Sequence, residues 1–224
     1  MKRKQTSGIL RKAALIMCAV CQMCGISATM KAQNAASILD KAASAYEKSN
    51  GISASYAVHT RSDAQKASES FEGTIQMKGD KFVLVTPDAT TWFDGETQWS
   101  YVERNEEVNV TTPSGDELQF TNPALLLKTY KKGFTANFIG ESTAQSGKTA
   151  YDIELLPKKK SDIQRAELQI EKTSSFPVKI RVEAKNGVTT TINISGIKTG
   201  INQPDDCFVF NKKDYPDAEV IDLR

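Results

Sequence analysis

The chain has 224 residues, enough for a single domain with a sizeable core. Its formal net charge is +2, but six of its 29 basic residues and none of its 27 acidic residues lie within the first 32 positions, so residues 33–224 carry 23 basic and 27 acidic side chains, a net charge of −4. A mildly acidic body argues against nucleic-acid binding and against electrostatic docking on anionic lipid.

Residues 1–32 differ in kind from the rest. A basic start (Lys2, Arg3, Lys4, Arg11, Lys12) precedes an apolar run over residues 13–28, which predicts a secretory signal peptide. The run is short and is interrupted by Gln22, so a permanent membrane anchor is the weaker interpretation. We expect cleavage after Ala32 or Ala28, with Ala32 preferred, and a single domain over residues 33–224.

Three of the four cysteines, Cys18, Cys21 and Cys24, belong to that leader, and none of them follows a convincing lipobox. A lipidated mature end is therefore not expected. Only Cys207 remains after cleavage, so the sequence predicts neither an internal disulfide nor a cysteine metal cluster. The apolar core has to stabilise the exported domain without covalent crosslinks.

The body begins with a predicted amphipathic helix over Ser37–Asn50. Ile38, Ala42 and Tyr46 share one face of it, and Gly51 follows where a helix would stop. Alternating apolar residues then predict a first strand over Ile52–His59, and a polar loop is expected over Arg61–Ser70.

The stretch Phe71–Val110 carries large side chains at every second position, the period of a half-buried strand. Turn residues interrupt it at Lys78-Gly79-Asp80, Thr86-Pro87-Asp88 and Asp94-Gly95-Glu96. It predicts a meander of about four antiparallel strands, since such short turns cannot return a chain in parallel. Both tryptophans lie here, and the apolar face is either core or a ligand surface.

A loop over Thr111–Thr121 leads to a sharply marked helix. Asn122 suits the N-cap, Pro123 the first helical position, and Gly133 the end. The three leucines 125–127 and Tyr130 give this helix more apolar surface than one side needs, so we expect it to be sandwiched or to close over an apolar space.

The second half predicts strands alone. They are expected at 134–141, 148–156, 163–172, 176–184 and 188–197, with Asn186-Gly187 forming a type I′ hairpin turn. A short strand over Cys207–Phe210 and a polar tail over Lys212–Arg224 would follow. About ten or eleven strands and two or three helices, without alternation, indicate an α+β fold, mainly β: a curled antiparallel sheet with helices against its concave face.

Groups for catalysis are scarce. His59 is the only histidine, which excludes a histidine-pair metal site, and its strand carries nothing like a nucleophile elbow. Cys207 follows Asp206, whose negative charge disfavours a thiolate. The acidic pairs Glu106-Glu107 and Asp205-Asp206 point to opposite faces if they lie on strands. We expect no enzyme, no cofactor and no metal.

Several short motifs resemble the periplasmic carrier of outer-membrane lipoproteins, the LolA family. They are Phe71-Glu72-Gly73, the strand pair around Lys78 and Phe82, Pro87, the Asn122-Pro123 helix start, and Asp94–Tyr101, which looks like the family's Asp-Gly-Lys-Thr-x-Trp-x-Tyr hairpin. The resemblance covers nearly all of the mature chain. Lys78 stands where the family has an arginine, and lysine cannot make the same forked hydrogen bonds, so this candidate lid latch is expected to be tuned differently.

The resemblance implies an incomplete antiparallel barrel of about eleven strands with a helical lid over an apolar cavity. It also implies a monomeric, soluble periplasmic carrier that shuttles acylated lipoproteins from an inner-membrane ABC transporter to an outer-membrane acceptor or to the membrane itself. Each CH₂ moved from membrane to water costs about 0.8 kcal/mol, so acyl chains need such shelter. The candidate acyl-binding residues are Phe71, Ile75, Met77, Phe82, Leu84, Trp99 and Tyr101 on the sheet, with Leu126, Leu127 and Tyr130 on the lid.

Three alternatives stay open. The same fold would suit a carrier or sensor of free lipids or glycolipids. It would also suit an envelope scaffold whose apolar face is simply filled core. A hydrolase built on His59 would need a nucleophile and a carboxylate within hydrogen-bond reach of that ring.

Overall fold

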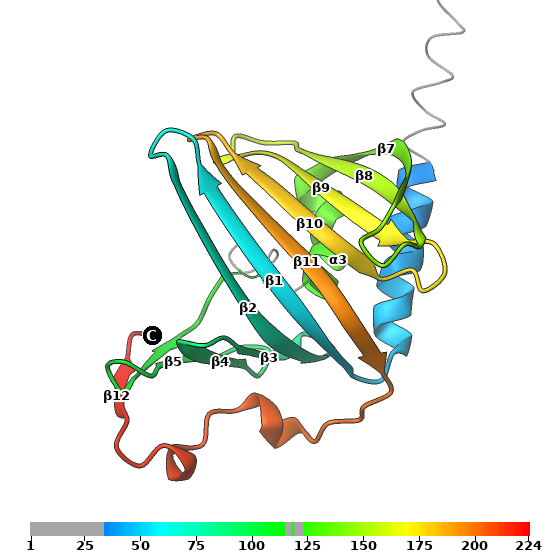
Figure 1. Cartoon of the computed structure of the whole chain (residues 1–224). Helices are drawn as coiled ribbons and strands as arrows, with labels where there is room; N and C mark the ends of the chain where they lie inside the picture. Colours follow the sequence, from blue (N-terminus) through cyan, green and yellow to red (C-terminus); the bar gives the residue numbers. More distant parts are fainter. Residues whose placement is uncertain (1–33, 115–117, 119–122) are drawn as a thin grey trace, which may run out of the picture.

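The computed structural model describes residues 34–114, 118 and 123–224 (Figure 1). The predicted signal peptide over residues 1–32 lies outside the described residues, as do the predicted N-cap Asn122 and most of the predicted loop Thr111–Thr121.

Two α-helices stand beside one sheet. The N-terminal helix runs over residues 34–48, and α3 over Pro123–Gly133. Both were predicted, the first with bounds three residues too late at its start and two too late at its end. Helix α3 carries Lys131 and Lys132 in its last turn, where positive charge interacts favourably with the helix dipole.

The strands form a single sheet of twelve in the order β12-β6-β5-β4-β3-β2-β1-β11-β10-β9-β8-β7. Two meanders, β1 to β6 and β7 to β11, meet where β1 pairs with β11. The bounds are β1 Ile52–Ser62, β2 Ala67–Lys78, β3 Lys81–Val85, β4 Ala89–Phe93, β5 Gln98–Val102, β6 Glu107–Thr111, β7 Phe134–Thr143, β8 Thr149–Pro157, β9 Ile163–Glu171, β10 Pro177–Ala184, β11 Val188–Thr199 and β12 Glu219–Asp222.

Four local predictions are wrong. The predicted loop Arg61–Ser70 is mostly strand, because β1 and β2 extend their antiparallel pairing as far as Ser62 and Ala67. The meander from β2 to β6 has five strands rather than about four. The predicted strand Cys207–Phe210 is not a strand, and its first two residues end a 3₁₀ helix, Asp205–Phe208. The last strand, β12, lies inside the predicted polar tail and pairs in parallel with β6, so the sheet is not wholly antiparallel.

The hairpin between β10 and β11 is confirmed, but its turn is not type I′. Such a turn needs positive φ at both central residues, and only Gly187 has one, at +82°. The Gly187 amide donates to the Ala184 carbonyl at 3.1 Å. A three-residue connection, with glycine in the left-handed position, closes the hairpin instead.

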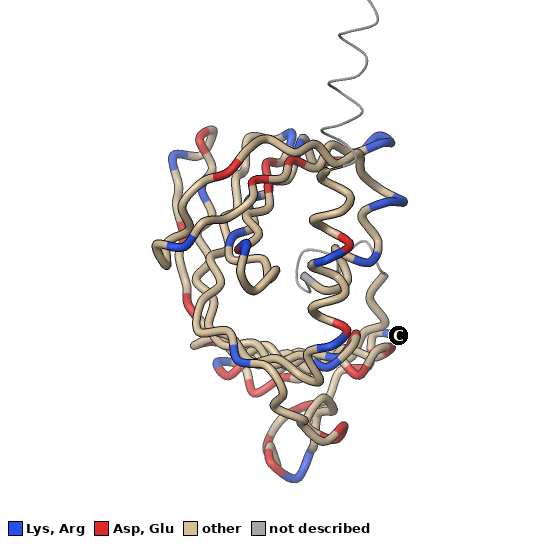
Figure 2. The backbone as a smooth tube through the Cα atoms, turned by 90° about the vertical axis from the view of Figure 1, so that its right-hand side faces the viewer, with Lys and Arg blue, Asp and Glu red and all other residues tan. Residues whose placement is uncertain are grey.

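The sheet curls around the two helices, and Figure 2 shows the helices facing its inner side. The main core lies there: Leu39 and Ala42 of the N-terminal helix and Leu126 of α3 pack with Ile153 of β8 and Ile180 of β10. After β11 the chain turns away and runs along the opposite face of β3 to β5 before it ends in β12 (Figure 1). The two faces of the sheet are therefore covered by different parts of the chain.

Candidate functional site

A continuous row of apolar side chains crosses the inner face of seven strands. Directly paired residues share a face, so the register assembles this row from β7 through β11 to β1 and β2. In order across the sheet it contains Phe138, Ile153, Leu168, Ile180, Ile192, Val58 and Phe71. Of these seven, only Phe71 was named as a site residue from the sequence. The register that aligns the others is not visible in a one-dimensional pattern.

The row passes from covered to uncovered. Leu168 and Ile180 are fully buried beneath the helices, Ile192 and Val58 are half-buried, and Phe71 is 38% exposed. Leu84 of β3, on the same face, is also half-buried. The apolar inner face thus extends beyond the two helices that cover its other end. A partly exposed apolar face of this kind is typical of a binding surface.

The remaining predicted lining residues of this face are buried together. Ile75, Met77 and Phe82 form one cluster with Tyr56 and Phe93. Gly73 makes this packing possible, because a Cβ there would lie 2.5 Å from the Tyr56 hydroxyl. The Tyr56 ring crosses β2 at that point, and its hydroxyl donates to the Val85 carbonyl at 3.4 Å. The glycine of the Phe71-Glu72-Gly73 motif thus has a packing role.

The three predicted lid residues of α3 point into the core. Leu126, Leu127 and Tyr130 are all at most 3% exposed and pack against the sheet. Burial raises the pKa of Tyr130 to about 12, with a smaller contribution from the Asp40 carboxylate. In this conformation their side chains fill the space between α3 and the strands.

Trp99 and Tyr101 lie on the opposite face. Trp99 pairs with Trp92, and Trp92 with Val83, whereas Phe82 pairs with Phe93. Successive residues of a strand alternate between faces, so both predicted lining residues point away from Phe82. They pack under Phe208, Phe210 and Tyr215 of the C-terminal segment. We therefore exclude them from the candidate site.

Lys78 holds that C-terminal segment and not α3. Its ammonium donates to the Gln203 carbonyl at 2.8 Å and to Asp205 at 2.9 Å, and Lys81 reaches the other Asp205 oxygen at 2.8 Å. The hydrogen bonds of Lys81 and Lys78 lower the pKa of Asp205 to about 2. A lysine acts as a point charge in such a contact, where the arginine of the resembled family would offer a fork.

Two other ion pairs tie α3 to its surroundings. Lys128 pairs with Asp80 of the β2–β3 turn at 2.6 Å, and Lys131 pairs with Asp40 of the N-terminal helix at 2.7 Å. A crevice of about 140 Å³ follows the seam between these three elements. The β2–β3 turn is thus a junction: Asp80 holds the helix on the inner side, while Lys78 and Lys81 hold the C-terminal segment.

The surroundings of His59 and Cys207 do not support the hydrolase alternative. His59 lies on the outer face of β1, and its ring contacts the Ser70 hydroxyl at 2.7 Å in an exposed pair. Cys207 is exposed. Among the described residues, no cluster of three or more His, Cys, Asp or Glu side chains is placed to hold a metal ion. Within the same residues, no helix has the length and apolar character to span a bilayer.

Comparison with known proteins assigns the family. A family model described as "Outer membrane lipoprotein carrier protein LolA" matches residues 26–187, well over half of the chain. The protein belongs to the LolA family. The description of this family names a carrier protein rather than an enzyme. No functionally curated protein matches the sequence.

Solved structures resemble this chain at low sequence identity. An uncharacterised conserved protein from Thermus thermophilus is 15% identical with a TM-score of 0.57, covering 83% of this chain and 97% of its own. A LolA superfamily protein from Nitrosomonas europaea is 14% identical with a TM-score of 0.45, covering 79% and 97%. The lipoprotein LppX from Mycobacterium tuberculosis is 15% identical with a TM-score of 0.45, covering 77% and 97%.

Proposed function

We propose that this protein is a periplasmic carrier that shelters the acyl chains of lipoproteins on the inner face of its sheet. The observation that carries this proposal is the row from Phe138 to Phe71, which is apolar throughout and emerges half-exposed beyond the helices. Membership of the LolA family supports the cargo class and the envelope location. The predicted signal peptide over residues 1–32 supports export.

The energetic requirement fits an apolar face with few fixed polar contacts. Moving an acyl chain from membrane to water costs about 0.8 kcal/mol for each CH₂. A soluble carrier must therefore offer enough apolar area to offset this free energy. Val58, Phe71 and Leu84 offer such area without hydrogen-bonding groups. Area without directional bonds gives affinity for the chain while allowing its release to an acceptor.

Helix α3 serves in this proposal as a displaceable cover. Leu126, Leu127 and Tyr130 now occupy the inner space over β7 to β10, so room for long chains comes from moving α3 away from these strands. The surface pairs Lys128–Asp80 and Lys131–Asp40 hold the cover in place, and exposed pairs of this kind contribute little free energy. Opening therefore has a small electrostatic cost, and acyl chains replace the apolar contacts that α3 gives up.

The route follows from the cargo. Lipoproteins would be loaded from an inner-membrane ABC transporter, which supplies the energy for extraction, and delivered to an outer-membrane acceptor or to the membrane itself. The carrier is proposed to act as a monomer, without a cofactor. Lys78 is part of the β2–β3 junction in this proposal. It binds the C-terminal segment next to the point where Asp80 pairs with Lys128 of α3.

Mass spectrometry of material that co-purifies with the native periplasmic protein, prepared without detergent, tests the proposal. Triacylated polypeptides are expected. Free diacyl lipid alone would instead select the lipid or glycolipid carrier. Protein that carries nothing, and takes up no apolar dye, would identify an envelope scaffold and overturn the proposal.

Matched substitutions locate the binding face. Phe71→Glu and Leu84→Glu place charge on the inner face, and both should abolish cargo retention while export continues. Val85→Glu is the control, because Val85 is the neighbour of Leu84, points to the outer face and is already 40% exposed. Normal retention by both inner-face variants would show that the lining is misassigned.

A further inference from the structure

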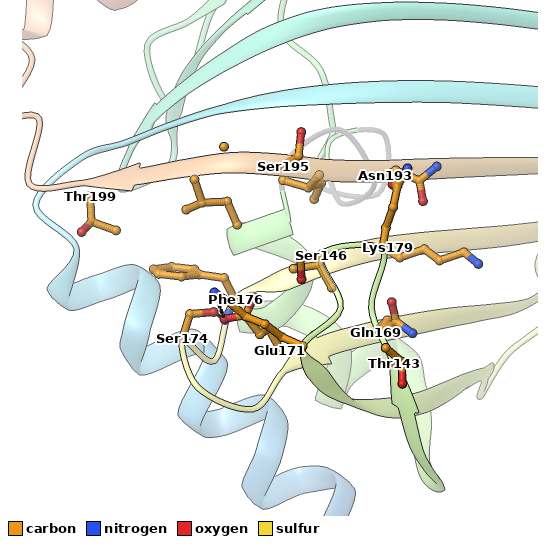
Figure 3. Close-up of a pocket in the computed structure, with 16 residues that line it drawn as sticks. Thr143, Ser146, Gln169, Glu171, Ser174, Phe176, Lys179, Asn193, Ser195 and Thr199 are labelled. Atoms are coloured by element: carbon orange, nitrogen blue, oxygen red, sulfur yellow. Dashed lines mark hydrogen bonds and ion pairs between the residues drawn. The ribbon is translucent and has the colours of Figure 1, made fainter.

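A hollow of about 840 Å³ lies on the outer face of the sheet, away from the acyl-binding face. It sits where β9, β10 and β11 end, under the turn that connects β7 and β8 (Figure 3). Its volume falls within the range of about 300–1,000 Å³ that small-molecule sites occupy.

The register fixes which side chains enter this hollow. Gln169, Lys179 and Asn193 are directly paired across β9, β10 and β11, so they share one face. The residues that follow or precede them, Leu168 and Ile180, point into the core on the other face. The hollow therefore opens on the face opposite the proposed acyl-binding row, and Phe176, Ile194 and Ile197 separate it from the inner-face cluster in which they also pack.

The hollow has a fixed floor and wall. Glu171 is only 5% exposed, and its carboxylate accepts from Lys148 at 3.0 Å. The β7–β8 turn is closed by the Ala144 amide, which donates to the Lys148 carbonyl at 2.8 Å. Gln169 is held by its hydrogen bond to the Ser142 hydroxyl at 2.7 Å. These contacts preorganise the site before any ligand arrives.

The polar groups around the hollow differ from those on the rest of this face. Farther along the same strands, Arg165 and Arg181 are both paired with Glu183 at 2.7 Å. Around the hollow, seven polar side chains make no hydrogen bond or ion pair with any other described residue. They are Thr143, Gln145, Ser146, Lys179, Asn193, Ser195 and Thr199. Their donors and acceptors are open to a ligand.

The kinds of group indicate the kind of ligand. Amides and hydroxyls offer donors and acceptors in similar number, as the vicinal hydroxyls of a sugar require. Phe176, Val178 and Ile197 add apolar edges that suit the C–H face of a sugar ring. Two lysines and one glutamate leave a single positive charge, too little for a dedicated anion site. The lining mixes polar and apolar groups, which suits a sugar ring better than an alkyl chain. We propose that this groove binds a neutral saccharide, as a short oligosaccharide.

Titration of the ¹⁵N-labelled full mature protein with neutral oligosaccharides of two to six rings (chito-, cello-, malto- and manno- series) tests the proposal. At least one series should bind saturably and shift the backbone amides of Ser146, Gln169, Lys179 and Asn193. Asn193→Ala and Gln145→Ala should each weaken that binding about two- to tenfold, the effect of one lost hydrogen bond. Thr191→Ala is the control, since Thr191 is on the same strand and face but outside the groove, and it should leave the affinity unchanged.

Charge distinguishes a sugar site from an anion site. Binding of a neutral sugar should be insensitive to salt, because screening acts on charge–charge attraction. Lys179→Gln removes the charge but keeps a hydrogen-bond donor, so it should change the sugar affinity by no more than about threefold. Saturable binding of inorganic phosphate with loss in Lys179→Gln, or shifts confined to other residues, would overturn the proposal. So would the absence of saturable binding in all four series.

Discussion

Two helices cover the inner face of strands β8 to β10, whereas the C-terminal segment covers the outer face of strands β3 to β6. The first group packs its inner face under two helices, through Ile153, Leu168 and Ile180, and presents an outer face of paired charges to water. The second group buries its outer face, where Val83 and Trp92 lie under Phe208 of the C-terminal segment. Between the two, the apolar inner face of β1 and β2 is partly exposed at Val58 and Phe71, where neither cover reaches fully.

Two separate covers explain how one curled sheet can keep a partly exposed apolar face and still have a buried core. Each half is stabilised by its own cover, so the inner face of β1 to β3 need not be sealed for the protein to stay folded. The C-terminal cover lies beyond residue 187, where the match to the family model ends. Breaking either cover separately tests whether the two are independent.

Removing the centre of the C-terminal cover has the largest expected effect on stability. Phe208 is fully buried among Val83 and Trp92, and Phe208→Ala should lower the free energy of unfolding by about 3–5 kcal/mol, through lost burial and the cavity left behind. Urea denaturation followed by tryptophan emission measures this, because Trp92 and Trp99 both lie under this cover.

The neighbouring residue supplies the control for that experiment. Val209 is 39% exposed, so Val209→Ala should change stability by less than about 0.5 kcal/mol. Equal effects of the two substitutions would mean that the aromatic cluster does not anchor the segment.

Much of the fold was predictable from the sequence, and for a physical reason. Strands β8, β9 and β10 were placed to within about a residue, because glycine and polar turn residues mark their ends locally. Helix α3 was placed as well, because proline and glycine mark its two ends. Signals of this kind depend on the backbone of a few adjacent residues, and tertiary contacts do not change them.

The faces of the strands were harder to predict. Alternation shows that Phe82 and Trp99 belong to buried faces, but it cannot say that these faces are opposite, since that depends on pairing through β4. Strand β12 was missed because it is four residues long and three of them are exposed in the structure. Its position depends on β6, more than a hundred residues away in the chain.

A smaller effect is expected where α3 meets the β2–β3 turn. Lys128→Gln removes the ion pair with Asp80, and since both side chains are partly exposed, global stability should fall by less than about 1 kcal/mol. The α3 amides should nevertheless exchange faster in this variant, relative to the β9 amides, because α3 opens locally. Lys132→Gln, on the same helix but exposed, is the control and should leave both unchanged. Equal exchange rates of the α3 amides in Lys128→Gln and Lys132→Gln would show that the Lys128–Asp80 pair does not restrain α3.

The smallest effect is expected at low pH and concerns only the C-terminal segment. Lys81 and Lys78 lower the pKa of Asp205 to about 2, so its contribution to stability is present above the unfolded pKa of about 3.9 and is lost as the pH falls towards 2. Tryptophan emission should report loosening of this cover over that window, while exchange in β9 stays slow. The pKa of Asp222 is also lowered to about 2, by Arg224, in the same segment. Asp205→Asn should therefore abolish the transition and Asp222→Asn should preserve it. The reverse result would show that β12, and not the contact with the β2–β3 turn, holds the cover closed.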